Sequence, residues 1–338
     1  MLLTYLGRRL ALAVVALFGV VVTAFLVAHM VPADPLEVVL SDQATKDPAI
    51  REAYRKRWGL DRSVPEQFLA YLGNVLRGDL GESFTTRRAV LRDLAQFVPA
   101  TIELSLAALA VSVAFGVPLG VWAAVRHNRT ADHAARIVSL VGAASPIFWT
   151  GLIALYVFYY ALGWAPGPGR VDTHLTLPPP LTGFLLLDSL VLGDLEIFRS
   201  ALRHLVLPAL VLGWFILGIV ARTTRAALLE VLAADYVRTA RAKGLGEGLV
   251  IGVHALRNAL IPVVTVIGLN FASLLSGAVL TETVFAWPGI GRYAVTASIR
   301  LDYPAILGVT MLTAVIYIVV NLLVDLVYGV LDPRIRVE

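Results

Sequence analysis

The residues of this sequence best suited to binding chemistry form one polar stretch between two apolar runs, Asp235-Tyr236-Val237-Arg238-Thr239-Ala240-Arg241-Ala242-Lys243-Gly244. Ala240 and Gly244 are four residues apart, so on a helix they share a face, and their small size gives a shallow surface that a partner approaches closely. Gly244 also suits a helix end, where a left-handed residue reverses the chain. The spacing predicts a docking helix. The alternative is a basic helix that only anchors the chain to anionic lipid.

A second set of polar residues lies inside apolar runs, and it comprises Glu103, Asn270, Asn321 and Asp325. Charged and amide groups at membrane depth are costly, so they normally face protein or water. Each is therefore a candidate for lining a translocation path. The alternative for Asn270, Asn321 and Asp325 is a hydrogen bond between helices. The alternative for Glu103 is an ion pair with a basic residue of a partner subunit.

Several kinds of enzyme chemistry lack their residues in this sequence. There is no cysteine, and the six histidines are scattered without the spacing of metal ligands. No Gly-x-x-x-x-Gly-Lys-Ser/Thr phosphate loop is present, so the chain is not expected to hydrolyse ATP itself. We predict no catalytic residue, no metal site and no cofactor bound by this chain.

The elements that carry these residues are expected to be membrane helices. Of the 338 residues, 58% are hydrophobic and 15% are charged, which is more apolar surface than one soluble core hides. A bilayer-spanning helix needs about 20 predominantly apolar residues. Continuous rather than alternating apolar runs favour helices over a barrel. Six runs qualify: Leu10–Met30, Val98–Val125, Ile137–Gly163, Ala201–Ala221, Ala259–Thr281 and Pro304–Val330.

The charges of the short loops orient these spans. Segment 126–136 carries three basic residues and one acidic residue, and segment 222–257 carries six basic and three acidic. Segment 164–203, on the other side, has three basic and four acidic residues. The positive-inside rule places both termini in the cytosol. The chain is expected in the plasma (inner) membrane. This bias accounts for the net charge of +4 without nucleic acid.

Two polar regions are expected outside the membrane. Residues 31–97 contain helix-like stretches at Ile50–Trp58 and Pro65–Leu76 and are predicted to form an external cap. The run Gly183–Gly193 is too short to span and predicts an interfacial or external helix. The first apolar run is longer than a typical signal-peptide core and lacks a small-x-small site at its end, so it is expected to be a retained span.

The polar stretch that begins at Asp235 resembles the coupling loop of permease subunits in ATP-binding-cassette (ABC) importers. That family's pattern is Glu-Ala-Ala, three residues, Gly, nine residues and Ile-x-Leu-Pro. Arg238-Thr239-Ala240, Gly244 and His254-Ala255-Leu256-Arg257 follow this spacing but depart at the Glu, Ile and Pro positions. These departures match the dipeptide and oligopeptide (peptide/nickel-type) subfamily, first-permease type. The similarity extends to Asp79–Ser83, Pro146–Trp149, Leu280–Gly289 and Asn321–Leu326.

The resemblance implies an all-α integral membrane protein with six transmembrane helices, the type I ABC importer permease fold, and an external region after the first helix. Residues 1–97 would hold the first helix and the external region. Residues 98–338 would form the core permease domain, with the coupling loop at 222–258. Implied partners are a second homologous permease, two ABC ATPase subunits or domains that hold ATP and Mg, an extracytoplasmic solute-binding protein and membrane lipid.

The resemblance also assigns roles to individual residues. ATPase coupling falls to Asp235, Tyr236, Arg238, Thr239, Ala240, Arg241, Ala242, Lys243 and Gly244. Glu282, Phe285 and Trp287 belong to an outer segment that would form an outer gate or contact a solute-binding protein. Glu103 and Asn270 remain possible path residues because of their membrane depth, not because of the resemblance. The alternative for the Trp-Pro-Gly turn and its aromatic neighbours is an interfacial belt.

The expected function is a membrane path for di- and oligopeptides that a solute-binding protein delivers and separate ATPases energise. Within the same family, nickel complexes or glutathione are alternative cargoes. A different class, a secondary transporter driven by an ion gradient, is disfavoured because the intramembrane acid and histidine chains of proton relays are missing. A membrane scaffold or receptor without transport would leave the coupling loop unexplained.

Overall fold

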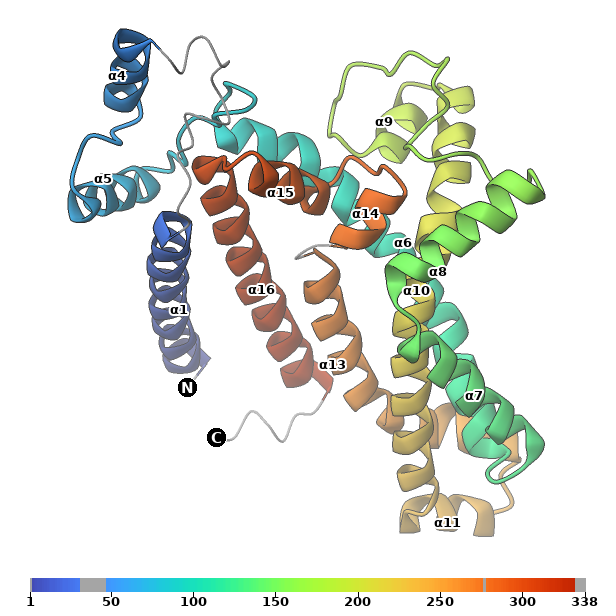
Figure 1. The fold of residues 1–338 in the computed structure, drawn as a ribbon. Coiled ribbons are helices and arrows are strands. Elements are labelled where there is room, and N and C mark those ends of the chain that lie inside the picture. Colours follow the sequence, from blue (N-terminus) through green and yellow to red (C-terminus); the bar gives the residue numbers. More distant parts are fainter. Residues whose placement is uncertain (1, 31–46, 276–277, 332–338) are drawn as a thin grey trace. The chain divides into compact units, whose positions relative to one another are not determined.

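The structure is a computed structural model that describes residues 2–30, 47–275 and 278–331 (Figure 1). Within these residues the chain is helical, and no strand is present apart from one isolated bridge between Glu82 and Ala89. Contacts divide the chain into two compact units, residues 1–99 with 289–318 and residues 100–288 with 319–338. The division predicted at residue 97 separates regions by expected role and stays a prediction.

The first unit is built from helices of the N-terminal region and two later segments. Its helices are α1 (Leu2–Met30), α4 (Pro48–Arg57), α5 (Val64–Leu76), α15 (Ile290–Ile299), the first turns of α6 (Val90–Val125) and the first half of α16 (Tyr303–Leu331). The two helices expected in the external cap are confirmed as α4 and α5. Asp47 caps α4 through Ala49 N, and Ser63 forms a capping box with Glu66 at the start of α5.

A buried carboxylate fixes the loop of this unit that precedes α6. Asp302 accepts hydrogen bonds from Ser83 Oγ at 2.6 Å, Phe84 N at 3.1 Å and Thr85 N at 2.9 Å. Its Oδ1 also accepts from Ala305 N at 3.3 Å in the first turn of α16. Because a buried charge is costly unless its lone pairs are satisfied, this network holds the loop in one conformation.

The second unit is organised around one long helix. Its helices are the rest of α6, α7 (Thr130–Ala144), α8 (Ile147–Ala154), η1 (Leu155–Ala161), α9 (Leu185–Val191), α10 (Leu195–Leu232), α11 (Asp235–Ala242), α12 (Glu247–Leu249), η2 (Val250–Ala255), α13 (Leu256–Leu275) and α14 (Val279–Val284). Helix α10 packs against α7 and α13. A Cβ at Gly218 would lie 2.5 Å from Ser139 O, so only glycine permits the close approach of α7 to α10.

The observed helices account for most of the predicted spans but do not confirm their number. Among the described residues, four helices are long and apolar enough to cross a membrane: α6, α10, the run Glu247–Leu275 and the Tyr303–Leu323 part of α16. Helix α1 contains a shorter apolar stretch, Ala11–Val27. The predicted fifth span extends to Thr281, but α13 ends at Leu275 and α14 begins at Val279.

The predicted third span, Ile137–Gly163, is not one continuous helix. Its two halves, Thr130–Ala144 and Ile147–Ala161, are bent by 101° at a short break. The break contains Ser145 and Pro146, and a residue before proline is driven out of the helical region, as the extended conformation of Ser145 shows. This segment is either a broken span or a re-entrant loop.

Candidate functional site

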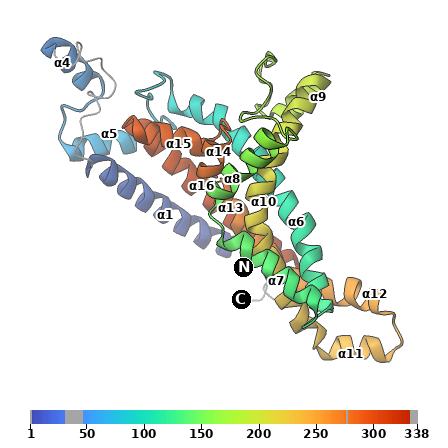
Figure 2. The ribbon, with the colours of Figure 1, turned by 45° about the vertical axis from the view of Figure 1, so that its right-hand side comes forward.

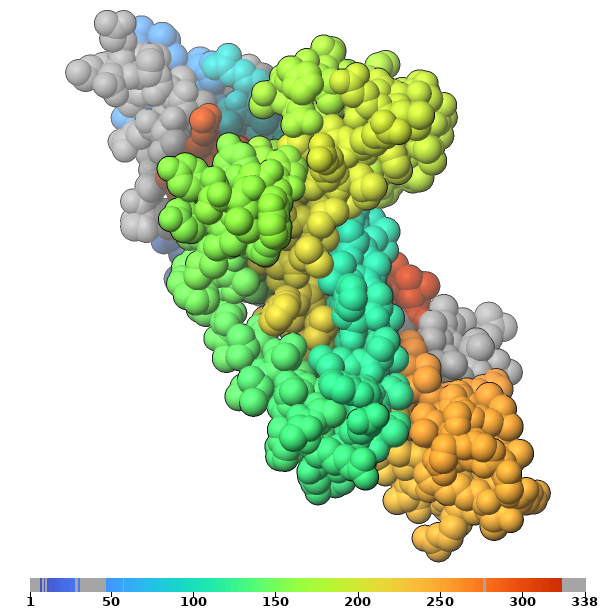
Figure 3. Space-filling view, turned by 90° about the vertical axis from the view of Figure 1, so that its right-hand side faces the viewer, coloured from blue at the N-terminus to red at the C-terminus, as the bar shows by residue number. Residues whose placement is uncertain are grey.

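The candidate coupling segment forms a short helix across one end of α10. Helix α11 begins after Ala234 and ends at Ala242, with Lys243 as its C-cap. Gly244 follows with φ +77°, the left-handed conformation predicted for the residue that stops this helix. Figures 1 and 2 show α11 running across the end of α10, and in Figure 2 α12 lies beside it. In Figure 3 the orange segment forms a knob next to the ends of α6 and α7.

Two side chains of α11 point into the protein and fix its position. Val237 is fully buried and Ala240 is 8% exposed. They belong to a cluster that includes Leu228 of α10, Val250 and Ala255 of η2, Ala259 of α13 and Ala124 of α6. Val237 and Ala240 are three residues apart and share one apolar face of α11. This face holds the helix against the protein, as expected for an amphipathic surface helix.

The burial of Ala240 corrects one part of the prediction. Ala240 and Gly244 were expected to form a common accessible surface, but only Gly244 is exposed. Ala240 is small because the cluster beneath α11 is close-packed. The accessible face instead consists of the other predicted residues, Asp235, Tyr236, Arg238, Thr239, Arg241, Ala242, Lys243 and Gly244.

Polar contacts close the loop on either side of Gly244. Arg241 donates from Nε to Glu247 Oε1 at 2.7 Å and from Nη2 to Oε2 at 3.2 Å. Asn258 Nδ2 donates to the Tyr236 hydroxyl at 2.8 Å. The first contact joins α11 to α12, and the second joins it to α13.

The end of α10 that carries α11 is itself anchored. Arg225 of α10 donates from Nε to Asp132 Oδ1 at 2.7 Å and from Nη2 to Oδ2 at 2.8 Å. Asp132 is fully buried and also accepts from Asn128 N at 2.9 Å. Asp132 lies in α7 and Arg225 in α10, and the sequence does not predict their contact because nothing in a separation of 93 residues indicates it.

Four of the five predicted path residues lie in one region of the second unit. Trp287 Nε1 donates to Ala100 O at 2.8 Å, and Thr101 Oγ1 donates to Glu282 Oε1 at 2.6 Å. Glu282, Phe285 and Trp287 are all at most 3% exposed. The aromatic rings therefore pack inside the protein, and the interfacial-belt alternative does not describe them. The sequence does not predict the hydrogen bonds that Ala100 and Thr101 form with Trp287 and Glu282.

Glu103 forms an ion pair within this chain. Arg170 donates to Glu103 Oε2 from Nη2 at 2.6 Å and from Nε at 3.2 Å, and Leu186 N donates to Oε1 at 2.9 Å. Arg170 Nη2 also donates to Gly183 O at 3.1 Å, and its guanidinium lies 5.9 Å from the Trp287 ring centroid. Because a buried acid needs a basic partner, the position of Glu103 could have indicated an arginine nearby. The sequence does not show that this arginine is Arg170.

Asn270 lies apart from this group. Its Nδ2 donates to Val266 O at 2.7 Å within the same helix, so the predicted interhelical bond is not formed by this atom. Asn270 lines a cavity of about 320 Å³ between α10, α13 and α14, together with Ser273 and Thr281. Asn321 is half-buried on α16, and the side chain of Asp325 lies outside the described residues.

Comparison with known proteins identifies the family. Residues 116–337 match the model of the "binding-protein-dependent transport system inner membrane component", and residues 2–106 match the model of the N-terminal part of such membrane components. The chain belongs to this family. It is an ABC transporter permease, a multi-pass membrane translocation subunit rather than a catalytic one.

Individual relatives of this permease are similar over almost their whole length. The di/tripeptide transport system permease protein of Pseudomonas aeruginosa is 47% identical over 335 residues, 99% of each chain. The probable D,D-dipeptide transport system permease protein of Escherichia coli K12 is 47% identical over 322 residues, 95% of this chain and 94% of the relative. The dipeptide transport system permease protein of the same strain is 43% identical over 337 residues, 99% of each.

Proposed function

We propose that this permease forms the membrane path for di- and oligopeptides in an importer energised by separate ATPase subunits. The peptide cargo is supported by the names of relatives that share 43–47% identity with the chain over nearly its full length. The family description itself implies a binding protein that works with the membrane component. The proposed partners are therefore that solute-binding protein, a second permease and two ATPase subunits or domains that carry ATP and Mg.

The observation that carries the coupling role is the two-sided character of α11. Val237 and Ala240 fasten the helix to α6, α10, η2 and α13, while most of its other side chains are exposed. A partner that grips the exposed face therefore moves several helices at once. Close contact at Gly244 is sterically easy, since no atom lies within 4 Å of the position that a Cβ would occupy there.

The proposed cycle is a population shift between two states. A loaded binding protein docks on the external face, and ATP-driven closure of the ATPases pulls α11 of this chain and its equivalent in the second permease. The bent and proline-containing helices rotate, the peptide enters from outside, and ATP hydrolysis returns the inward-facing state. Each step requires a partner that binds one state more tightly than the other. In this orientation both termini lie in the cytosol.

Uptake into proteoliposomes tests this function. The four-component complex with its binding protein is reconstituted and supplied with labelled dipeptide and ATP. Uptake is expected to stop when the phosphate-loop lysine of the ATPases is replaced, and to persist when ion gradients are collapsed with ionophores. Uptake that survives ATPase inactivation and follows an ion gradient would establish a secondary transporter instead.

A further inference from the structure

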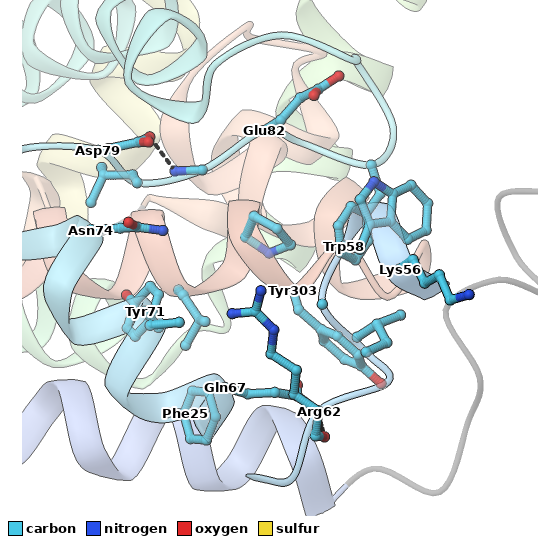
Figure 4. A pocket seen from close by; sticks show the side chains of 18 residues that line it. Phe25, Lys56, Trp58, Arg62, Gln67, Tyr71, Asn74, Asp79, Glu82 and Tyr303 are labelled. Atoms are coloured by element: carbon cyan, nitrogen blue, oxygen red, sulfur yellow. Dashed lines mark hydrogen bonds between the residues drawn. The ribbon is translucent and has the colours of Figure 1, made fainter. Parts of the chain in front are cut away.

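A second site of binding chemistry lies in the first unit, away from the residues assigned to coupling and gating. A pocket of about 370 Å³ opens between the outer part of α1, the turn that joins α4 and α5, the segment after α5 and the first turn of α16 (Figure 4). This volume is within the range of about 300–1,000 Å³ that is usual for small-molecule sites.

Aromatic rings form the walls of the pocket and hold one another in place. Trp58 stacks on Phe84 with ring centroids 4.0 Å apart, and Phe84 meets Tyr303 edge-on at 6.4 Å. Phe25 stacks with Tyr71 at 6.1 Å. Asp302 fixes the backbone of Phe84 from behind, so these walls are rigid before any ligand arrives. A preformed apolar wall lowers the entropic cost of binding.

Arg62 supplies the principal polar group. Figure 4 shows its side chain reaching into the pocket between the aromatic rings. Gln67 Nε2 donates to Arg62 O at 2.9 Å and fixes the backbone from which the side chain projects. The pKa of Glu66 is lowered chiefly by hydrogen bonds from Ser63 and also by the charge of Arg62, but among the described residues Arg62 forms no ion pair with a carboxylate. A guanidinium with free donors binds a carboxylate through two parallel hydrogen bonds.

The remaining polar groups balance this charge. Asp79 and Glu82 line the pocket on another side from Arg62, and Lys56 lies at its edge (Figure 4). Among the described residues that line the pocket, two side chains are cationic and two are anionic. In Figure 4 the Glu82 carboxylate and the Lys56 ammonium group point away from Arg62 and the aromatic rings, so Arg62 and Asp79 are the charged groups that a ligand in the pocket would meet. A molecule that carries both charges is complementary to this arrangement.

We propose that this pocket binds a short peptide as a zwitterion, with its carboxylate at Arg62, its ammonium group at Asp79 and an apolar side chain against the aromatic wall. The Asn74 amide, between Asp79 and Tyr71 in Figure 4, is placed to bond a peptide group. The proposal rests on the proposed function for its choice of ligand, and it adds a peptide site on the permease that is separate from the membrane path.

Direct binding of labelled Ala-Phe tests this site. The complex of permeases and ATPases is held in lipid nanodiscs without its binding protein, and binding is measured by equilibrium dialysis. Wild-type protein is expected to bind Ala-Phe saturably, and the C-terminal amide of the same dipeptide should bind about 10- to 100-fold more weakly, as loss of hydrogen bonds to a charged group implies. In Arg62→Gln the free acid and the amide should bind equally weakly.

Two controls make the result specific. Arg77→Gln, an exposed arginine that does not line the pocket, should bind like wild type. N-acetylation of the dipeptide should weaken binding to wild type but not to Asp79→Asn. Absence of saturable binding, or an amide effect that persists in Arg62→Gln, overturns the proposal.

A further arm separates a peptide from a lipid headgroup. Glycerophosphoethanolamine should not displace Ala-Phe, and displacement of the label only by this compound would identify a headgroup site and overturn the peptide assignment. Uptake with the binding protein is measured in parallel. Absence of saturable Ala-Phe binding to the wild-type complex, with intact ATP-driven peptide uptake, rejects this inference alone, whereas absent peptide uptake rejects the proposed function.

Discussion

At the scale of single residues, α11 shows how burial divides one short sequence into two roles. Ala240 and Ala242 are chemically identical and two positions apart, yet Ala240 is buried and Ala242 is exposed. The first contributes to the attachment of α11 to its own chain. The second belongs to the exposed surface that is proposed to contact a partner. The pair therefore allows attachment and partner binding to be tested separately.

Leucine at each of these positions has a different expected effect. Ala240→Leu overfills the cluster beneath α11 and should destabilise the protein by about 1–3 kcal/mol. Ala242→Leu should change stability by less than about 0.5 kcal/mol, as is usual at exposed positions, yet reduce the uptake obtained per ATP hydrolysed. Thermal unfolding of the purified permease and coupled uptake measure the two effects. Equal destabilisation by both substitutions would contradict the burial of Ala240.

The contribution of the Asp188 carboxylate to stability is expected to depend on pH. Burial raises the pKa of Asp188, but hydrogen bonds from the Thr182 hydroxyl and the Thr182, Gly183 and Leu181 backbone outweigh it, so the pKa is below its ordinary value. A depressed folded pKa means that the carboxylate stabilises this turn above the unfolded pKa of about 4, and that the stabilisation is lost as pH falls through the folded pKa.

The predicted consequence is local loosening in acid. Amide hydrogen exchange at Leu181–Gly183, corrected for the intrinsic pH dependence of exchange, should lose protection below about pH 4. In Asp188→Asn the protection should be lower and nearly independent of pH over the same range. Protection that is unchanged in acid, or a pH dependence that remains in the variant, would show that other groups hold this turn.

At the scale of elements, the Glu103–Arg170 pair joins α6 to the segment before α9. Glu103 is 9% exposed and the side chain of Arg170 is 15% exposed, so the pair is shielded from solvent. Glu103 also bonds Leu186 N, and Arg170 bonds Gly183 O, which fixes both ends of the segment. Removing one partner of such a pair leaves the other charge uncompensated.

We expect Glu103→Gln to cost about 3–5 kcal/mol of stability, as is usual when a buried pair is broken. Hydrogen exchange should rise at residues 183–186, which depend on this pair. Arg199→Gln, an exposed arginine on α10, is the matched control and should leave both measurements near wild type. Unchanged exchange in Glu103→Gln would mean that the pair does not hold the segment.

At the scale of the whole molecule, composition and apolar runs were enough to predict a helical membrane protein, because lipid requires long continuous apolar helices. Pro146 predicts a kink in the third apolar run, but not a bend of 101°, since proline is tolerated within membrane helices and packing decides how far the helix bends. Gly244 was predicted correctly from backbone preference alone. Whether Ala240 points into the protein or outward depends on the fold of α10, η2 and α13. The small size of its side chain does not indicate which.

The difference between local preference and long-range packing also explains why the burial of the outer segment was not predicted. The burial of Phe285 and Trp287 follows from long-range contacts with α6 and its neighbours, such as the bond from Trp287 to Ala100 O. Local composition, in contrast, is typical of a membrane interface. The partner of Glu103 lies 67 residues along the chain, and no periodicity connects the two.

The central claim, that a partner ATPase grips the exposed face of α11, is tested most directly by site-specific cross-linking. The chain contains no cysteine, so Thr239→Cys and Lys243→Cys each introduce its single thiol for benzophenone maleimide. Arg77→Cys on the C-cap of α5 is the control. In the assembled, transport-active complex, we predict photo-cross-links from both α11 positions to an ATPase subunit and none from the control. Active complexes whose α11 probes label only lipid would contradict the account.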